Sequence, residues 1–357
     1  MKTSLRTTRL QLTEPLRISR STMTARDAVW LTVEHDGQHG YGEAVSSVYY
    51  GLDAAVLERL LDVESEWLGG FADPESALEV LRDAGRPGVP PSVTAAVESA
   101  LLDLVGRRAD RPVHQLLGPG APPEPPSAPT ARTIGITSPQ HAAAQAAALS
   151  RSGFSLLKIK AGASDPADDL TRVRAVRAAA PQARLLLDPN GAWSFTTALP
   201  LLGQYAELGV EAVEQPLPPG TPDDLARLAE KSPLPVIADE DAVGFEDARR
   251  LAGRVHGINV KLAKCGGVTA ALRIAELIAE SDTALMLGCL TASTLGIAPA
   301  AHLVDRARWV DLDGHLLLAD DPWTGIGGAD GTVRAGREPG LGVRPRRRDE
   351  PRRAEPC

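Results

Sequence analysis

The sequence is poor in cysteine, and its few cysteines follow no recognisable pattern. Cys265, Cys289 and Cys357 are an odd number, and they form no Cys-x-x-Cys pair and no zinc-binding spacing. A disulfide framework is therefore excluded, and a reducing compartment fits better than secretion. We expect a cytoplasmic protein.

Long apolar runs and an excess of positive charge are also missing. Charged residues interrupt the first 16 residues, which therefore lack the apolar core of a signal peptide, and no run approaches the length needed to cross a bilayer. Lysine and arginine number 38 against 46 acidic residues, so the net charge is 38 − 46 = −8. Nucleic acids and anionic membranes call for basic surfaces, so we expect neither as a partner.

The N-terminal third predicts a small α+β module. Two β-rich runs, residues 5–14 and 27–35, precede Gly40-Tyr41-Gly42-Glu43, and three segments with helical periodicity follow at 54–67, 75–82 and 93–107. Ser92 stands where a helix cap is expected for the third helix. We assign residues 1–122 to a capping domain that part of the C-terminal segment completes. Residues 344–357, rich in Arg, Pro and Glu, are expected to form a disordered tail.

From residue 128 to 325 the chain repeats a unit of strand, loop and helix. Eight short apolar runs occur, and the spacing between the ends of successive runs varies only from 22 residues (Asp239 to Lys261) to 28 (Lys160 to Asp188) over the last seven. Strands that alternate regularly with helices indicate parallel βα units, and eight of them close a barrel. The fold class we predict is α/β, a modified TIM barrel of the (β/α)7β type with the N-terminal capping domain.

Polar residues end most of these strands. In a TIM barrel the carboxyl ends of the strands form the active-site mouth, and charges buried there must face one another. Their positions in the chain predict one cluster, made of Lys158, Lys160, Asp188, Glu214, Asp239, Lys261, Asp311 and Asp313.

Three of the carboxylates predict a metal site. Asp188, Glu214 and Asp239 end three consecutive strands, and an all-oxygen ligand set suits a hard cation, with Mg²⁺ the obvious occupant at one per subunit. The alternative is three unrelated surface carboxylates, which their repeated strand-end position disfavours.

The lysines predict acid–base chemistry. Lys160 and Lys261 belong to the second and sixth strands, which are opposite in a ring of eight, so one amine can remove a proton and the other return it on the second face. The metal would hold the substrate carboxylate and neutralise the charge formed. Nearby cations, including Lys158, would lower the pKa of Lys160. The alternative is that these lysines only neutralise the carboxylates.

At these residues the chain resembles the enolase superfamily, within its muconate-lactonising-enzyme subgroup. The resemblance spans about residues 5–330 and implies the same barrel, magnesium and paired lysine bases. It is carried by Gly40-Tyr41-Gly42-Glu43, Lys158-Ile159-Lys160, Asp188-Pro189-Asn190, Glu214-Gln215-Pro216, Ala238-Asp239-Glu240 and Asn259-Val260-Lys261-Leu262. Pro189 departs from the alanine that is common there.

One branch of the subgroup is favoured. Asp311-Leu312-Asp313-Gly314 resembles the Asp-x-Asp of dipeptide epimerases, which binds the free α-ammonium group of a dipeptide. The same resemblance implies that Thr133 and Leu290 contact the substrate and that Lys158 binds its carboxylate. The implied activity is epimerisation at the α-carbon of the C-terminal residue of a dipeptide.

Substrate preference and rival activities stay open at this point. Where relatives that act on Ala-Glu carry a cationic residue, the spacing places Met23, with Arg20 and Arg26 nearby, so we expect a second residue that is not acidic. Rivals on the same fold are N-succinylamino-acid racemase, o-succinylbenzoate synthase and muconate cycloisomerase. A different class is a non-catalytic peptide-binding protein. The resemblance also makes a homo-oligomer possible.

Overall fold

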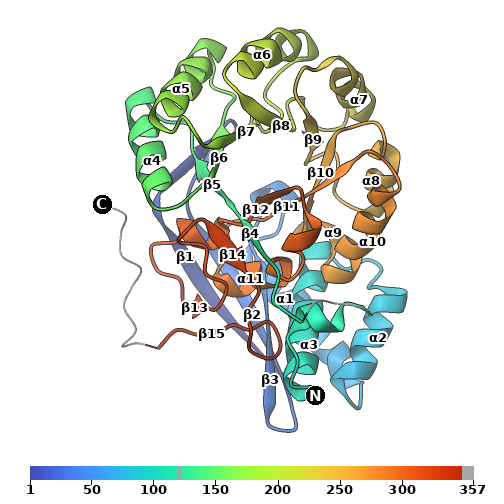
Figure 1. The fold of residues 1–357 in the computed structure, drawn as a ribbon. Helices are drawn as coiled ribbons and strands as arrows, with labels where there is room; N and C mark the ends of the chain where they lie inside the picture. The colour runs from blue at the N-terminus through green and yellow to red at the C-terminus, as the bar shows by residue number, and fades with distance from the viewer. Residues whose placement is uncertain (119–122, 348–357) are drawn as a thin grey trace.

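The computed structural model describes residues 1–118 and 123–347, and its centre is a parallel sheet of eight strands that curls into a barrel (Figure 1). The strands follow one another in chain order around the ring, and the first and last lie side by side. They are β5 (Ala131–Ile134), β6 (Leu156–Lys160), β7 (Arg184–Asp188), β8 (Val210–Glu214), β9 (Val236–Ala238), β10 (Gly257–Lys261), β11 (Ala284–Gly288) and β12 (Trp309–Asp311). The predicted α/β barrel is confirmed.

Helices connect the strands and cover the outside of the barrel (Figure 1). They are α4 (Pro139–Arg151), α5 (Pro166–Ala179), α6 (Phe195–Glu207), α7 (Pro222–Lys231), α8 (Phe245–Leu251), α9 (Leu262–Cys265), α10 (Val268–Ala279) and α11 (Thr294–Ala301). Among the described residues after β12, the one helical element is a short 3₁₀ turn, Gly314–Leu317, in agreement with the (β/α)7β pattern. Several helices begin at side-chain caps, such as Ser138 and Ser194, whose side chains accept from the backbone N–H three residues on.

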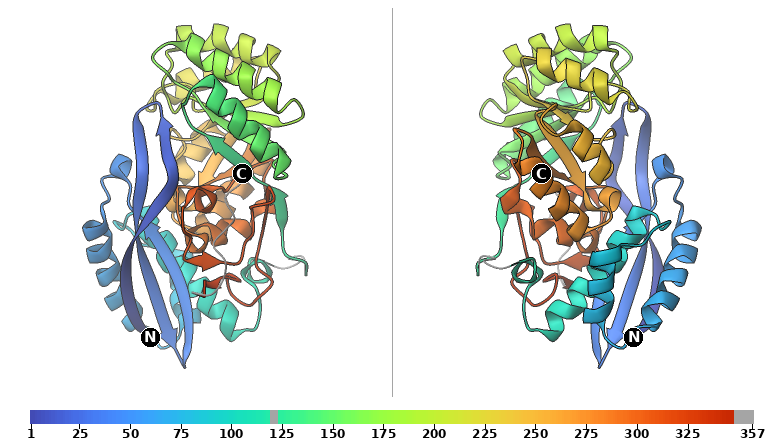
Figure 2. Two further views of the ribbon diagram at one scale, coloured as in Figure 1. Left: turned by 90° about the vertical axis from the view of Figure 1, so that its left-hand side faces the viewer. Right: turned by 90° about the vertical axis from the view of Figure 1, so that its right-hand side faces the viewer.

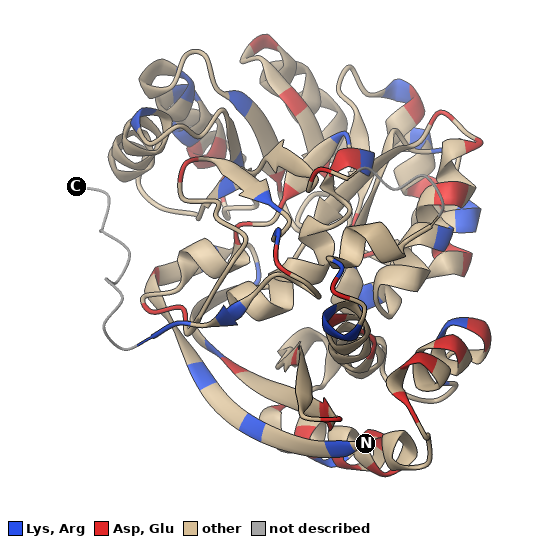
Figure 3. Cartoon of the chain, turned by 60° about the horizontal axis from the view of Figure 1, so that its bottom comes forward, with Lys and Arg blue, Asp and Glu red and all other residues tan. Residues whose placement is uncertain are grey.

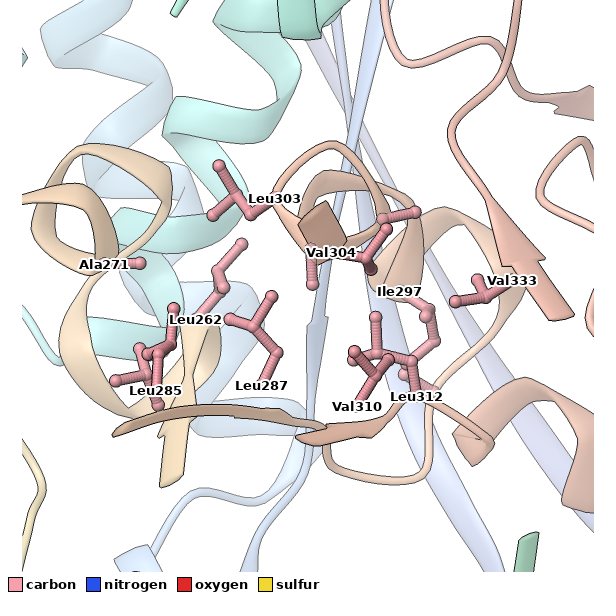
Figure 4. Packing of buried hydrophobic residues seen from close by; sticks show 14 of the residues in the cluster. Leu262, Ala271, Leu285, Leu287, Ile297, Leu303, Val304, Val310, Leu312 and Val333 are labelled. Carbon is pink, nitrogen blue, oxygen red and sulfur yellow. The ribbon is translucent and has the colours of Figure 1, made fainter. Parts of the chain in front are cut away.

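The strands alternate between an inner and an outer face, as their sequence predicts. Inner residues at the amino ends of the strands close the bottom of the barrel, and Trp309 is the largest of them. A Cβ at position 257 would lie 2.7 Å from the Trp309 ring, so Gly257 makes room for it. Outer residues such as Leu287 and Val310 pack against surrounding helices and turns (Figure 4). The charged residues are thereby left for the opposite, carboxyl end.

The N-terminal residues form the cap, a three-stranded antiparallel sheet with three helices. The strands are β1 (Lys2–Ile18), β2 (Ser21–His35) and β3 (Gln38–Val45), and the helices are α1 (Ala54–Gly69), α2 (Pro74–Ala84) and α3 (Pro91–Arg108). The sheet stands along one side of the barrel (Figure 2). A Cβ at Gly40 or Gly42 would collide with the backbone of α3, which explains both glycines.

Two predictions for local structure are wrong. Ser92 does not cap α3: the helix begins at Pro91, two residues earlier than expected, with Pro90 at the cap position, and the buried Ser92 hydroxyl has no hydrogen-bond partner. Proline at the first helical position starts the helix without a side-chain cap. Arg344 and Pro345, expected to begin the disordered tail, instead form β15 (Arg344–Pro345), which pairs with β13 (Trp323–Thr324). The rest of that tail from residue 348 lies outside the described residues.

A buried carboxyl group joins the cap to the barrel. Glu43, on β3, accepts hydrogen bonds from the Trp30 indole (2.6 Å) and from the backbone N–H of Ser293 (2.9 Å). Ser293 lies between β11 and α11, so Glu43 connects the two parts of the fold. Burial outweighs these hydrogen bonds and raises the pKa of Glu43 to about 7.

This raised pKa predicts how stability depends on pH. Glu43 has an ordinary pKa of 4.5, so between pH 4.5 and 7 the folded protein holds a proton that the unfolded chain has lost. Its contribution should therefore be full at low pH and be lost as pH rises through 7, by about 3 kcal/mol. Urea titrations from pH 4.5 to 8 measure the free energy of unfolding. Between these pH values it should fall by this amount more in the wild type than in Glu43→Gln. Equal slopes in the two proteins would refute the assignment.

Candidate active site

The structure brings all ten predicted site residues to the carboxyl end of the barrel strands. Each lies on a strand's last residues or in the loop that follows. Thr133 is on β5, Lys158 and Lys160 on β6, Asp188 on β7, Glu214 on β8, Asp239 just after β9, Lys261 on β10, Leu290 just after β11, Asp311 on β12 and Asp313 just after it. Strand alternation turns Lys158 and Lys160 inward, while Leu157 and Ile159 join the outer core.

Lys158 lies at the centre of the acidic cluster. Its ammonium nitrogen is 2.5 Å from Glu214 Oε2, 2.8 Å from Asp311 Oδ2 and 3.0 Å from Asp188 Oδ2. Burial alone would lower the pKa of Lys158, but the surrounding carboxylates raise it well above its ordinary value. The lysine therefore remains charged and neutralises carboxylates from three strands.

The other two lysines lie on either side of this cluster. Lys160 Nζ is 2.5 Å from Asp188 Oδ2, and Lys261 Nζ is 2.6 Å from Asp239 Oδ2. Their strands, β6 and β10, are four positions apart in the ring of eight. Burial opposes charge on Lys261, but Asp239 and Glu214 outweigh it and raise its pKa. Lys261 can act as a base only when those carboxylates pair with another cation.

The three carboxylates of the predicted metal site differ in their protonation. Burial disfavours charge on Asp188 and Asp239, but the lysines beside them hold both pKa values below the ordinary range. Burial and the charge of Asp188 raise the pKa of Glu214 to about 7. Across residues 1–118 and 123–347, no three Asp, Glu, His or Cys side chains converge closely enough to hold a metal ion, because ammonium groups lie between the carboxylates.

The donor set nevertheless suits a hard cation. Only oxygen ligands are offered, from consecutive strands, as Mg²⁺ requires. Three further acceptor oxygens near these carboxylates, Asn190 Oδ1, Glu240 Oε2 and Asp311 Oδ1, are buried without a hydrogen-bond donor. A buried acceptor left without a donor is costly, and additional positive charge at the mouth would relieve that cost.

Asp311 and Asp313 are held differently although they are two residues apart. Asp311 contacts Lys158 through one oxygen, and its other oxygen, Oδ1, has no hydrogen-bond donor. Asp313 accepts from the backbone N–H of Thr133 (2.7 Å) and lies 3.2 Å from Arg132. The carbonyl of Leu290 turns toward the same strand end, since a Cβ at Gly314 would lie 2.5 Å from it. The pair thus offers an acceptor to a cationic group beside the lysines.

Sequence reasoning missed the role of Lys264. Its buried ammonium group donates to Asp239 Oδ1 (2.6 Å) and to the backbone carbonyls of Asp239 (2.6 Å) and Asn259 (3.0 Å). Asn259 in turn donates to Glu214 at 2.8 Å. Lys264 and Asn259 thus fix the orientation of two carboxylates at the mouth, Asp239 and Glu214. The signal available in the sequence was a second lysine one helical turn after Lys261.

The cap places its first loop over the mouth. Arg20 lies at the tip of the β1–β2 hairpin and donates to Glu240 (2.7 Å) and to the carbonyl of Asn190 (3.1 Å), while its guanidinium lies over the Tyr49 ring. Met23 packs against the core and accepts a hydrogen bond from Arg26. Arg20 is therefore engaged by the barrel itself.

Comparisons with known proteins agree with this geometry. Residues 1–118 match the mandelate racemase / muconate lactonizing enzyme N-terminal domain, and residues 141–349 match the enolase C-terminal domain-like family. The chain belongs to this family of the enolase superfamily. Its architecture, with the cap beside a barrel whose charged mouth the cap covers, is accordingly that of the family.

Several relatives of this family member have known activities. A hydrophobic dipeptide epimerase from Roseobacter litoralis is 32% identical over 96% of this chain and 98% of its own length. An L-Ala-D/L-Glu epimerase from Escherichia coli is 33% identical over 86% of this chain and 91% of its own. The crystal structure of a dipeptide epimerase from Enterococcus faecalis, complexed with Mg and L-Leu-L-Tyr, superposes with a TM-score of 0.88 at 30% identity, covering 96% and 98% of the two chains.

The position of Lys264 predicts a stabilising role. Lys264→Met would leave the Asp239 and Asn259 carbonyls without their buried donor and remove a charge partner of Asp239. We expect the free energy of unfolding to fall by about 3 kcal/mol, the usual loss on breaking a buried ion pair. Chemical denaturation measures the change, with the exposed Lys231→Met as the matched control. A loss no larger than that of the control would contradict the role.

Proposed function

We propose that the chain is an isomerase, a dipeptide epimerase that removes and returns the proton at the α-carbon of the C-terminal residue. The observation that carries the proposal is the pairing of two features at one mouth. Lys160 and Lys261 face it from opposite strands, and Asp311 Oδ1 lies buried beside them without a donor. The first feature suits proton transfer on two faces, and the second suits an α-ammonium group.

The two lysines divide the proton transfer between them. Lys160 accepts the α-proton on one face of the carbon and Lys261 donates a proton on the other, and their roles exchange for the opposite stereoisomer. Each must be neutral when it accepts a proton. Since Asp188 and Asp239 hold the two ammonium groups at 2.5 and 2.6 Å, each lysine has to lose this pairing before it can act.

Asp188, Glu214 and Asp239 are the residues that would hold one Mg²⁺ per subunit. When bound, it supplies positive charge beside the substrate carboxylate, where negative charge develops on loss of the α-proton. The proposal is supported by the all-oxygen donor set and by related dipeptide epimerases that were crystallised with Mg, such as those from Enterococcus faecalis and Methylococcus capsulatus.

The remaining site residues position the dipeptide. Lys158 would bind the carboxylate of its second residue, exchanging one of its present carboxylate partners for it. Asp311 and Asp313 would receive the α-ammonium group of the first residue. Thr133 and Leu290 lie beside Asp313 and would bound the space for the peptide unit.

The rival activities place the wrong charge next to this aspartate pair. N-succinylamino-acid racemase and o-succinylbenzoate synthase act on substrates without a free ammonium group, and a muconate cycloisomerase would bring a carboxylate toward Asp311. Burial already raises the pKa of Asp311, so a further negative charge would be unfavourable. Binding a peptide without catalysis does not require lysines on both sides of the peptide's α-carbon.

Location and assembly remain predictions. The sequence leads us to expect a cytoplasmic enzyme, and the family resemblance makes a homo-oligomer possible. Within the described residues, no helix has the length and apolar character needed to cross a membrane. In the view of Figure 3, basic and acidic residues both occur along the outer helices.

A dipeptide library incubated in D₂O tests the function directly. With Mg²⁺ present, we expect deuterium at the α-carbon of the second residue of some dipeptides, followed by the second epimer, and no label in matched N-succinyl amino acids. EDTA should abolish exchange and added Mg²⁺ restore it, while circular dichroism stays unchanged. Label in the succinylated compounds alone would favour the racemase, and no label in any compound would refute proton abstraction.

Single substitutions of the two lysines test the two-base scheme. Lys160→Ala should lower the rate of α-proton exchange from one epimer of the dipeptide, and Lys261→Ala the rate from the other epimer. Each rate should fall by at least about 10²-fold, the contribution typical of a positioned base. Proton NMR in D₂O with each pure epimer measures both rates. Loss of exchange from both epimers to the same extent in each variant would contradict the assignment.

A further inference from the structure

The helix α5 buries an ion pair against the barrel. Asp169 and Arg172 lie one helical turn apart, and their carboxylate and guanidinium are in direct contact, with both side chains at most 2% exposed. Such a pair is a weak source of stability, because apolar residues of similar size fill the same space without removing two charges from water. The other hydrogen bonds of the pair therefore indicate its role.

The pair holds the backbone at the end of β6. Arg172 Nη2 donates to the carbonyl of Lys160 at 3.0 Å. Asp169 Oδ2 accepts from the backbone N–H groups of Gly162 (2.7 Å) and Ala163 (3.0 Å) in the loop that follows. Three polar groups of one short stretch of backbone are thus bound from outside the barrel by two side chains of α5.

The backbone after Lys160 lacks the support that a helix gives to Lys261. Lys160 ends β6 opposite Asp188, and β5 ends one residue earlier, opposite Ile159. A loop follows Lys160, whereas α9 begins directly after Lys261. The side-chain contact between Lys160 and Asp188 has to be lost before Lys160 can act as a base, so this contact does not position the amine during proton transfer.

The loop after Lys160 is also packed closely on its other side. A Cβ at Gly162, whose φ is +92°, would lie 2.6 Å from the Cβ of Ala192 and 2.7 Å from the Cβ of Ser19 at the tip of the β1–β2 hairpin. The loop therefore lies between the ion pair on α5 and the cap. Without the pair, its buried N–H and carbonyl groups would need other partners, and the backbone that carries Lys160 would shift with them.

We propose that Asp169 and Arg172 are positioning residues for Lys160, whose amine they place against one face of the substrate α-carbon by fixing the backbone that carries it. This inference rests on the proposed function, in which Lys160 accepts the α-proton on that face. Because other elements hold Lys261, loss of the pair should slow proton transfer on the Lys160 face and leave the opposite face intact.

Variants that remove the pair test this role. We compare wild type, Arg172→Met, Arg172→Lys and the double variant Asp169→Leu/Arg172→Met with the control Glu64→Leu/Arg86→Met, which removes a similar ion pair within the cap. Lys160→Ala identifies the epimer whose α-proton Lys160 removes. For this epimer, kcat of α-proton exchange in D₂O should fall at least about tenfold in Arg172→Met and in the double variant, since a misplacement of about 1 Å can cost about 10²-fold.

Other readouts separate positioning from a loss of stability. KM and the exchange of the second epimer should change little, and Arg172→Lys, which keeps a charge beside Asp169, should recover part of the rate. The double variant should melt no lower than Arg172→Met, because it leaves no unpaired buried carboxylate, yet its exchange should stay slow. Equal losses for both epimers, or the same one-sided loss in the control, would overturn the inference.

Hydrogen exchange of the backbone tests the same contacts without turnover. Mass spectrometry of peptides that cover residues 160–163 should show faster amide exchange in Arg172→Met than in the wild type, and no change in the control. Unchanged protection in Arg172→Met would also overturn the inference. Failure of the proposed function is distinct, because the wild type would then exchange no α-proton of any dipeptide, whereas failure of this inference leaves wild-type exchange intact.

Discussion

The mouth of this barrel depends on Lys158 and the carboxylates that surround it. Asp188 and Glu214 come from consecutive strands and Asp311 from the last strand, and their charges would repel one another inside a largely apolar barrel. An ammonium group at 2.5 to 3.0 Å from all three makes this arrangement possible. A buried carboxylate cluster without that cation would either take up protons or open the strand ends.

The apolar bottom of the barrel and the cap both support this cluster. Trp309 and the apolar residues around it fill the bottom of the barrel, so the inward charges occupy only the upper layer. The cap contributes Glu43, which joins it to the loop after β11, and Arg20, which spans from the hairpin tip to Glu240. The site is therefore assembled at the boundary of two parts of one chain.

Much of this arrangement could be read from the sequence because strands obey a simple alternation. Once Lys160, Asp188, Glu214, Asp239 and Lys261 were recognised as strand ends, the barrel placed them together. Lys264 was harder to predict, because its role depends on where a helical turn carries it in space. Ser92 was misread because a proline one residue earlier starts the helix, and β15 was missed because pairing between segments 20 residues apart leaves no local pattern.

The matched charges of the mouth also constrain how the lysines are activated. Asp188 pairs with Lys160 and Asp239 with Lys261, and these pairs hold both carboxylates ionised. Lys261 in such a pair is a poor base, because Asp239 and Glu214 raise its pKa. When other positive charge pairs with Asp239, the same electrostatics favours loss of a proton from Lys261. The carboxylates that suppress the bases are the ones proposed to bind Mg²⁺, so the arrangement itself couples proton abstraction to metal binding.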